Sequence, residues 1–385
     1  MSRRGLVTIV LRAAVALAEL SWLVAALNWH DRVRFPAGYA LAGAPLPAAL
    51  TVPVMGEADG VLRLARAGGE VRLERTAIGT GPGQAQLSPG ILTVAGGLGA
   101  GQFALLALLL AGVMPVQALR WWLLLRARAI APAPSTVLRL HLIGCFWNLL
   151  FPGLTGGDAV KAWQVAQGSG RTADAILSVV VDRILGLLAL FLLAAGAALL
   201  LSGSAAHQAL ALRAWLALAL LVGGLALWLS PALSRLSGLD RLFAWAQRRE
   251  PLARTVTALL AYRGHHATLL CGIACSATGH MLQIGGCIYA ARAVGIGCPW
   301  QELAVLLPLI FLIGALPISL FGLGVMEVAA VALLAGSADA TQVISMLVLY
   351  RCALIATSLP GGLLLIGRVQ RWGSPGAGVS AAGGP

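Results

Sequence analysis

The stretch NLLFPGLTGGDAVK, residues 148–161, lies between long apolar segments and contains one proline, three glycines and an aspartate. Proline lacks a backbone donor and glycine allows positive φ, so this composition interrupts a helix and permits a tight turn with exposed amides. Such backbone is tolerated at membrane depth only where protein or a water-filled cavity surrounds it. The stretch therefore predicts the tip of a returning hairpin that faces a polar path.

The amino-acid composition places this turn in a membrane protein. Hydrophobic residues make up 59% of the 385 residues and charged residues only 11%, and the mean hydropathy is +0.88, which exceeds what a soluble core needs. A bilayer requires roughly 20 apolar residues per helical span. The sequence predicts six full transmembrane helices, at residues 5–27, 98–119, 174–201, 209–230, 267–291 and 343–367.

Basic residues indicate which ends of these spans face the cytoplasm. The connections at residues 202–208 and 295–300 contain no lysine or arginine, so they are predicted to be extracytoplasmic. Trp121 and Trp122, beside Arg120, are typical of an aromatic belt at the inner interface. The positive-inside rule places both termini in the cytoplasm, together with Arg3, Arg4, Arg120, Arg126, Arg128, Lys161, Arg171, Arg235, Arg241, Arg248, Arg249, Arg254, Arg368 and Arg371.

Two further apolar tracts are interrupted by proline and glycine. The tract at residues 138–155 is predicted to enter and leave from the cytoplasm, and the tract at 302–336 from the outside, as a re-entrant hairpin or as two short spans. We therefore predict an all-α polytopic protein with two halves of opposite orientation, an inverted-repeat layout in which broken helices line a substrate path. The second tract repeats the residue types of the first, with Pro317, Gly322, Gly324 and Glu327.

Charged residues inside the predicted spans need a partner or water. Asp182 and Arg183 lie well inside the third span, where a charge costs on the order of 2.5 to 3.5 kcal/mol. Two interpretations stay open: a structural ion pair between helices, with Arg183 extending to the interface, or a pair that contacts a headgroup or gates its passage. Arg351, in the last span, complements Glu327 in depth and sign, so we expect these two to pair.

Two segments outside the spans have their own patterns. Residues 30–95 form a polar insert, predicted to be extracytoplasmic and β-rich, because Val61–Arg66 and Glu70–Arg75 alternate around two glycines as a hairpin does. Residues 231–263 mix leucine, tryptophan and arginine, which predicts an amphipathic helix on the inner leaflet.

No motif in the sequence indicates a cofactor. The six cysteines show no Cys-x-x-Cys spacing, and no spacing joins the histidines to acids as metal ligands. Asp158, Asp174 and Asp182 are too loosely spaced to predict the metal-binding carboxylate cluster of a phosphotransfer enzyme. We expect no cofactor, no metal ion, no catalytic residue and no nucleic-acid partner.

Four motifs, in this order, resemble a known family. They are NLLFPGLTGGDAVKAW, DAILSVVVDRILGL, PISLFGLGVMEVAA, and a terminal YR followed by PGG. Together they are similar to the membrane domain of the lysylphosphatidylglycerol synthase and flippase family, over residues 98–370. The resemblance implies a multi-pass protein of the inner (cytoplasmic) membrane that moves a phospholipid or a polyprenyl-linked lipid between leaflets, with the glycine-acid hairpins and the Asp-Arg pair lining its cavity.

Three departures limit what the resemblance implies. Met326 stands where the family often has a basic residue, and Lys161 stands where arginine is common. We also expect no aminoacyl-transferase domain, so synthase activity is not implied for this stand-alone form. The predicted domains are a first transmembrane helix (1–29), the extracytoplasmic insert (30–95), a flippase-like transmembrane domain (96–370) and a disordered cytoplasmic tail (371–385).

The preferred function is a lipid transporter rather than an enzyme. The alternatives are an intramembrane lipid headgroup or glycosyl transferase, and an accessory scaffold for one. A membrane lipid is the expected partner. A separately encoded lipid-modifying enzyme is compatible with the sequence as a second partner, and the oligomeric state stays open. Helix amino ends and Arg183 would hold the phosphate, while Asp158 and Glu327 would serve a cationic headgroup moiety or a coupling proton. The predicted substrate path comprises Asn148, Pro152, Gly156, Gly157, Asp158, Lys161, Asp182, Arg183, Pro317, Gly322, Gly324, Glu327 and Arg351.

Overall fold

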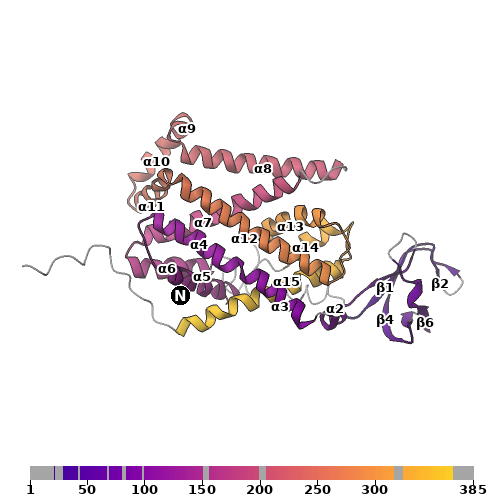
Figure 1. Ribbon diagram of the computed structural model, residues 1–385. Coiled ribbons are helices and arrows are strands. Elements are labelled where there is room, and N and C mark those ends of the chain that lie inside the picture. The colour runs from indigo at the N-terminus through magenta and orange to yellow at the C-terminus, as the bar shows by residue number, and fades with distance from the viewer. Residues whose placement is uncertain are drawn as a thin grey trace, which may run out of the picture.

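The protein consists of a helical bundle with a small β-sheet domain at one end (Figure 1). The computed structural model describes residues 21, 29–41, 44–66, 69–79, 84–97, 99–150, 156–198, 205–315 and 324–366. The predicted first span, apart from Ser21, and the predicted tail lie outside these residues.

Within the described residues, four long apolar helices form the bundle's framework. They are α3 and α4 taken together (Ala100–Ala111 and Val113–Ala127), α7 (Thr172–Ala198), α12 (His266–Ala293) and α15 (Ala340–Leu363). At 1.5 Å per residue they are roughly 36–42 Å long, enough to cross a hydrocarbon core. Large apolar side chains such as Leu108 and Leu363 are exposed on them, as expected for a surface that faces lipid. The protein is therefore a multi-pass membrane protein.

These four helices coincide with four of the six predicted spans. A fifth predicted span, residues 209–230, coincides with α8 (Ala205–Leu229), which packs mainly along α7. Its apolar stretch, Trp215–Leu229, is shorter than the four long ones within the part of the chain that the structure describes.

Shorter helices occupy the two broken tracts and pack as pairs. One pair is α5 (Pro134–Leu150) with α6 (Gly156–Ser169), and the other is α13 (Trp300–Gly314) with α14 (Val325–Leu334). Figure 1 shows the first pair near the end of the bundle where the short helices α9–α11 of residues 231–260 lie, and the second pair toward the end that carries the sheet. The connections within the pairs, residues 151–155 and 316–323, contain Pro152, Pro317 and Gly322 and lie outside the described residues.

Helix α12 contacts five other helices of the bundle, α3, α4, α7, α13 and α15. Small residues let the helices approach closely, as is common in membrane bundles. A Cβ atom on Gly272 would lie 2.6 Å from a methyl group of Leu185 on α7, and one on Gly286 would lie 2.9 Å from Leu110 on α3. The contact between α5 and α15 is closer still, because a Cβ on Gly361 would lie 2.0 Å from the backbone oxygen of Leu142.

Three short helices replace the single amphipathic helix expected at residues 231–263. They are α9 (Pro231–Leu236), α10 (Leu239–Gln247) and α11 (Glu250–Leu260), followed by a 3₁₀ turn at Ala261–Gly264. Ser230 caps α9 by accepting from the backbone N–H of Leu233, and Pro231 follows at the first helical position, so the chain turns sharply after α8.

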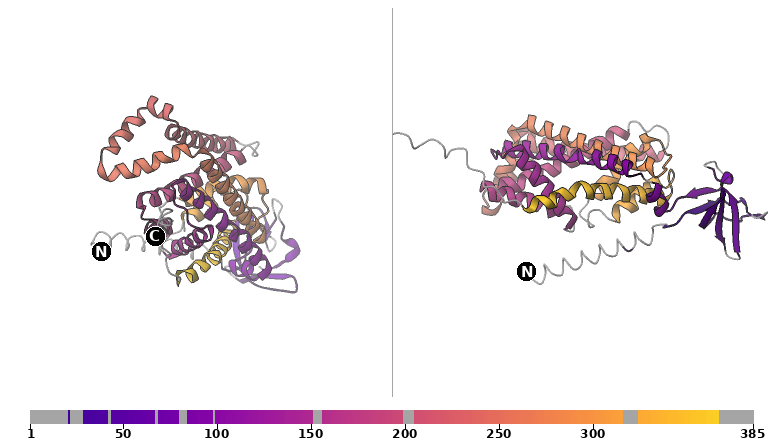
Figure 2. Two further views of the ribbon diagram at one scale, coloured as in Figure 1. Left: turned by 60° about the vertical axis from the view of Figure 1, so that its left-hand side comes forward. Right: turned by 60° about the horizontal axis from the view of Figure 1, so that its bottom comes forward.

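The small domain is built on a five-stranded antiparallel sheet in the order β6-β5-β4-β1-β7, set apart from the helices in the right-hand view of Figure 2. Val33, Phe35, Leu62 and Leu64 alternate with exposed residues and form its core. The predicted hairpin is present as β5 and β6. The strands are β1 (Arg32–Phe35), β4 (Leu50–Ala58), β5 (Val61–Arg66), β6 (Gly69–Glu74) and β7 (Gln86–Ser88), with β2 (Ala40–Leu41) and β3 (Ala44–Pro45) as a separate pair.

The first and last strands of this domain are neighbours. β1 pairs with β7, and just beyond them the backbone N–H of Gly90 donates to Asp31 at 2.6 Å. Helix α2 (Ile91–Gly97) then connects the sheet to α3. The chain thus enters and leaves the sheet at the same place.

Candidate functional site

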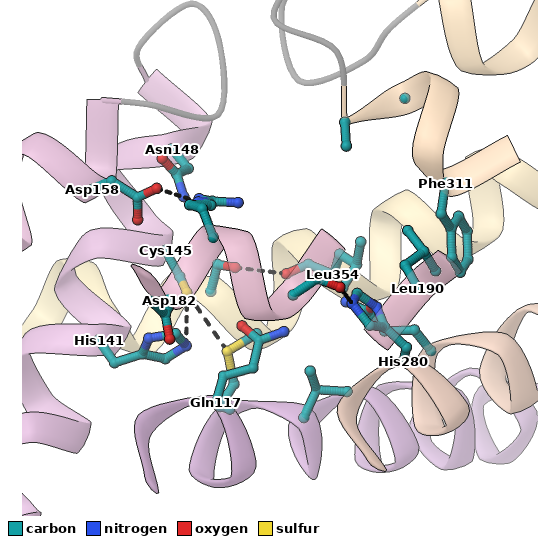
Figure 3. Close-up of a pocket in the computed structure, with 18 of the residues that line it drawn as sticks. Gln117, His141, Cys145, Asn148, Asp158, Asp182, Leu190, His280, Phe311 and Leu354 are labelled. Atoms are coloured by element: carbon teal, nitrogen blue, oxygen red, sulfur yellow. Dashed lines mark hydrogen bonds and ion pairs between the residues drawn. The ribbon is translucent and has the colours of Figure 1, made fainter. Parts of the chain in front are cut away.

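A cavity of about 390 Å³ lies inside the bundle, bordered by both helix pairs and by α4, α7, α12 and α15 (Figure 3). Its two sides differ in polarity. Asn148, Asp158 and Asp182 lie on one side, whereas Leu190, Phe311 and Leu354 lie on the other. The cavity therefore offers a charged region and an apolar region to one ligand.

Asp158 is the centre of the charged region. It is the third residue of α6, where the helix dipole favours a negative charge. Its Oδ1 lies 2.8 Å from Nζ of Lys161, and its Oδ2 accepts from Nε of Arg183 on α7. Asp158 and Lys161 are buried, but the Arg183 side chain is 44% exposed. Arg183 is thus the most accessible of these three cavity-lining residues.

Asp182, the neighbour of Arg183, has a different partner. Arg120 on α4 donates from Nε and Nη2 to the two carboxylate oxygens of Asp182, at 2.5 and 2.7 Å, and from Nη1 to Ser276 on α12 at 2.8 Å. Successive residues of a helix point about 100° apart, so Asp182 and Arg183 face different neighbours. Asp182 and Arg183 thus each form an ion pair to another helix, and both line the cavity.

This arrangement corrects the predicted interfacial position of two residues. Arg120 was expected at the cytoplasmic end of the second span, but α4 continues to Ala127 and Arg120 is buried. A bidentate pair with Asp182 is what makes a buried guanidinium acceptable there. Trp121 was expected in an aromatic belt, but it is fully buried and its Nε1 donates to Ser178 at 3.1 Å.

The charged region has more positive than negative charge. It contains three cationic side chains and two carboxylates, which gives a formal charge of +1. Of the fourteen acidic residues in the chain, only Glu19 lies outside the described residues. The five charged residues are Arg120, Lys161, Arg183, Asp158 and Asp182.

The second helix pair carries the predicted partner of Arg351. Glu327 is the third residue of α14, and its Oε1 accepts from Nε of Arg351 at 2.8 Å, so the predicted pair is confirmed. Its Oε2 accepts from the backbone N–H of Gly324 at 2.8 Å. Gly324 has φ +80°, a conformation that favours glycine. Met326, the departure from the family pattern, lies 3.6 Å from Nη2 of Arg351 through its sulfur.

Gly157 allows the backbones of α5 and α6 to touch. A Cβ atom at Gly157 would lie 1.8 Å from the backbone oxygen of Gly144, and its N–H donates to Oδ1 of Asn148 at 2.8 Å. Gly156, the first residue of α6, is half-buried beside it. This contact positions Asp158, which follows immediately in the chain.

Replacing Gly157 by alanine is expected to destabilise the protein by about 1–3 kcal/mol, because the new methyl group forces α6 away from α5. The thermal unfolding transition in detergent would measure the change. Gly285→Ala in α12 is the matched control, since nothing lies within 4 Å of its added Cβ. Equal effects of the two substitutions would contradict the close contact.

Sequence reasoning missed several polar residues of the cavity. His280 contacts the backbone oxygen of Gly186 through Nε2 at 3.1 Å and Oε1 of Gln283 through Nδ1 at 3.0 Å. His141 Nε2 lies 3.5 Å from Sγ of Cys145. The spacing of His141, Cys145 and Asn148 along α5 is the helical repeat of one face, a signal that was available in the sequence.

Residues 85–361 match the protein family described as the lysylphosphatidylglycerol synthase TM region. No curated protein and no solved structure matches the chain. The matched segment contains both helix pairs and every residue named above as lining the cavity.

Proposed function

Because the chain belongs to the family of the lysylphosphatidylglycerol synthase TM region, whose function is related to membrane lipids, we propose that it is a lipid flippase. It moves a phospholipid or a polyprenyl-linked lipid between the leaflets of the cytoplasmic membrane. The headgroup crosses through the cavity while the tails stay in the bilayer, and the protein supplies binding rather than catalysis.

The observation that carries this proposal is the positive charge of the cavity's polar region. Three cations and two carboxylates leave a formal charge of +1 in the interior of a membrane bundle. Unbalanced charge is costly in such surroundings, so an anion is favoured there. Phospholipids and polyprenyl-linked lipids both carry phosphate, and arginine binds phosphate through parallel hydrogen bonds.

The apolar region of the same cavity supports a lipid over a free anion. Phe311 and Tyr350 stack with their ring centroids 5.6 Å apart, and Leu190 and Leu354 lie nearby on the same wall. A headgroup in the charged region thus leaves the first carbons of its lipid beside apolar side chains. A purely ionic ligand would gain nothing from that wall.

The arrangement of the helix pairs supports a topology for the proposal. We take them as hairpins that enter the membrane from opposite faces, which makes the two halves inverted repeats, with six full spans. Arginine-rich α9–α11 and the first pair lie together, so this end is assigned to the cytoplasm with both termini. The sheet domain is then extracytoplasmic.

Lipid exchange in proteoliposomes tests the function. We expect fluorescent phospholipids or polyprenyl phosphates to change leaflets with the wild-type protein, and Arg183→Gln to slow that exchange about tenfold or more, because one charge-assisted contact to phosphate is lost. The ion pair between Asp158 and Lys161 is retained in this variant, so the fold is expected to persist. The initial rate of exchange is the quantity to measure.

Arg126→Gln is the matched control for this experiment. Arg126 is exposed and its guanidinium lies over the Trp122 ring at 4.8 Å, away from the cavity. Exchange at the wild-type rate is expected. If no lipid exchanges with the wild-type protein, even under a proton gradient, the flippase proposal fails. Turnover that requires magnesium or a nucleotide sugar would instead identify an intramembrane transferase.

A further inference from the structure

The two helix pairs carry an acid and an arginine at matching positions. Asp158 and Glu327 are each the third residue of the second helix of their pair. Arg183 and Arg351 are each the twelfth residue of the long helix that follows, α7 and α15. In both halves the acid binds the arginine, so the first pair of residues (Asp158–Arg183) and the second pair (Glu327–Arg351) are structural equivalents.

These equivalent ion pairs belong to helix pairs that lie toward opposite ends of the bundle. α6 lies near the end with α9–α11, whereas α14 lies toward the end with the sheet (Figure 1). Arg183 and Arg351 both line the cavity between them. Each half of the bundle therefore contributes one arginine to the same cavity.

The two ion pairs are in unequal states. The Arg183 side chain is 44% exposed, whereas Arg351 and Glu327 are 8% and 0% exposed. Glu327 also holds the backbone N–H of Gly324. Arg183 is thus the more accessible of the two arginines, and the second pair is closed.

We propose that the two ion pairs are alternating gates: the cavity opens past the first pair while the second is intact, and past the second while the first is intact. This inference rests on the proposed flippase function. An incoming phosphate binds Arg183 in place of Asp158. Lys161, at 2.8 Å, continues to balance the charge of Asp158. Opening the second pair separates Glu327 from the arginine that balances its charge in the interior, so we take the state with Arg183 accessible and the second pair intact as the resting state.

Thiol labelling tests the alternation without using lipid transport. Cys145 is a native residue of the cavity near the first ion pair, and Ala315 lines the cavity beside the second helix pair. Two proteins are compared in vesicles of known orientation. One retains Cys145 as its single cysteine, and the other has Ala315→Cys as its single cysteine. A membrane-impermeant thiol reagent is added on either side.

Glu327→Gln is expected to change the two labelling rates in opposite directions. Loss of the charged pair raises labelling of Ala315→Cys from the sheet-domain side about tenfold or more, and lowers labelling of Cys145 from the other side by a similar factor. Arg351→Gln is expected to do the same. Arg351→Lys, which keeps the charge but loses the planar fork, gives an intermediate change.

Glu302→Gln is the matched control, because Glu302 is an acid on the same helix pair that binds Ser337 and does not line the cavity. Neither rate is expected to change. If Glu327→Gln and Arg351→Gln raise one rate without lowering the other, or change neither, the alternation is overturned. Opposite changes in labelling without exchange of any lipid would overturn the flippase function and leave the gates standing.

Discussion

Replacing Asp158 by asparagine is expected to reduce lipid exchange to the background rate and to lower the free energy of unfolding by about 3–5 kcal/mol. Asp158 is the carboxylate that binds both Lys161 and Arg183, and its loss raises the formal charge of the polar region from +1 to +2. The two cations then repel each other in the interior. Exchange assays in proteoliposomes and thermal unfolding in detergent measure the two effects.

A double variant separates the effect on stability from the effect on exchange. Asp158→Asn combined with Lys161→Met returns the formal charge of the region to its wild-type value, so most of the stability is expected to return. Exchange stays low, because Arg183 has lost the carboxylate that orients it. If Asp158→Asn alone exchanges lipid at the wild-type rate, Asp158 is not part of the transport site.

Replacing Arg120 by glutamine is expected to lower the free energy of unfolding by about 3–5 kcal/mol. Arg120 joins α4, α7 and α12 through three hydrogen bonds, and without it Asp182 is a buried carboxylate that has lost its guanidinium partner. The unfolding transition followed by tryptophan fluorescence measures the loss. Arg126→Gln, an exposed residue on the same helix, is expected to change stability by less than about 0.5 kcal/mol.

A paired substitution of Arg120 and Asp182 distinguishes a role in stability from a role in lipid transport. Arg120→Met with Asp182→Leu replaces both charges by apolar groups, which is often neutral for stability. Lys161, Arg183 and Asp158 remain, so the region keeps its formal charge of +1 and lipid exchange is expected to persist. Complete loss of exchange in a stable double variant would show that Arg120 and Asp182 themselves contact the headgroup.

The sequence predicted those parts of the site whose signal is local. Glycine, proline and an acid within a few residues identify the positions of Asp158 and Glu327, because helix breakers inside an apolar tract are tolerated only where the backbone faces protein or water. Glu327 and Arg351 were paired from depth and sign, since a buried charge in a membrane requires a partner of opposite sign. Both predictions rest on the scarcity of charge in the bilayer.

The part that the sequence did not predict depends on contacts between distant helices. Arg120 follows a run of apolar residues and precedes Arg126, a pattern that is equally typical of an interfacial arginine. Its burial depends on Asp182 and Ser276, which are 62 and 156 residues away in the chain. Likewise, the adjacent Asp182 and Arg183 have different partners, which only the rotation of α7 against its neighbours decides.

The pairing of β1 with β7 makes the sheet domain an insertion whose two junctions coincide. Neighbouring strands are about 4.8 Å apart, so the chain leaves the sheet almost where it entered. A Cβ on Gly90 would lie 2.4 Å from the backbone carbon of His30, which shows how closely the two crossing segments touch. The helices are therefore expected to tolerate exchange of the whole module for a short turn or for another domain with adjacent ends, without rearrangement of the bundle.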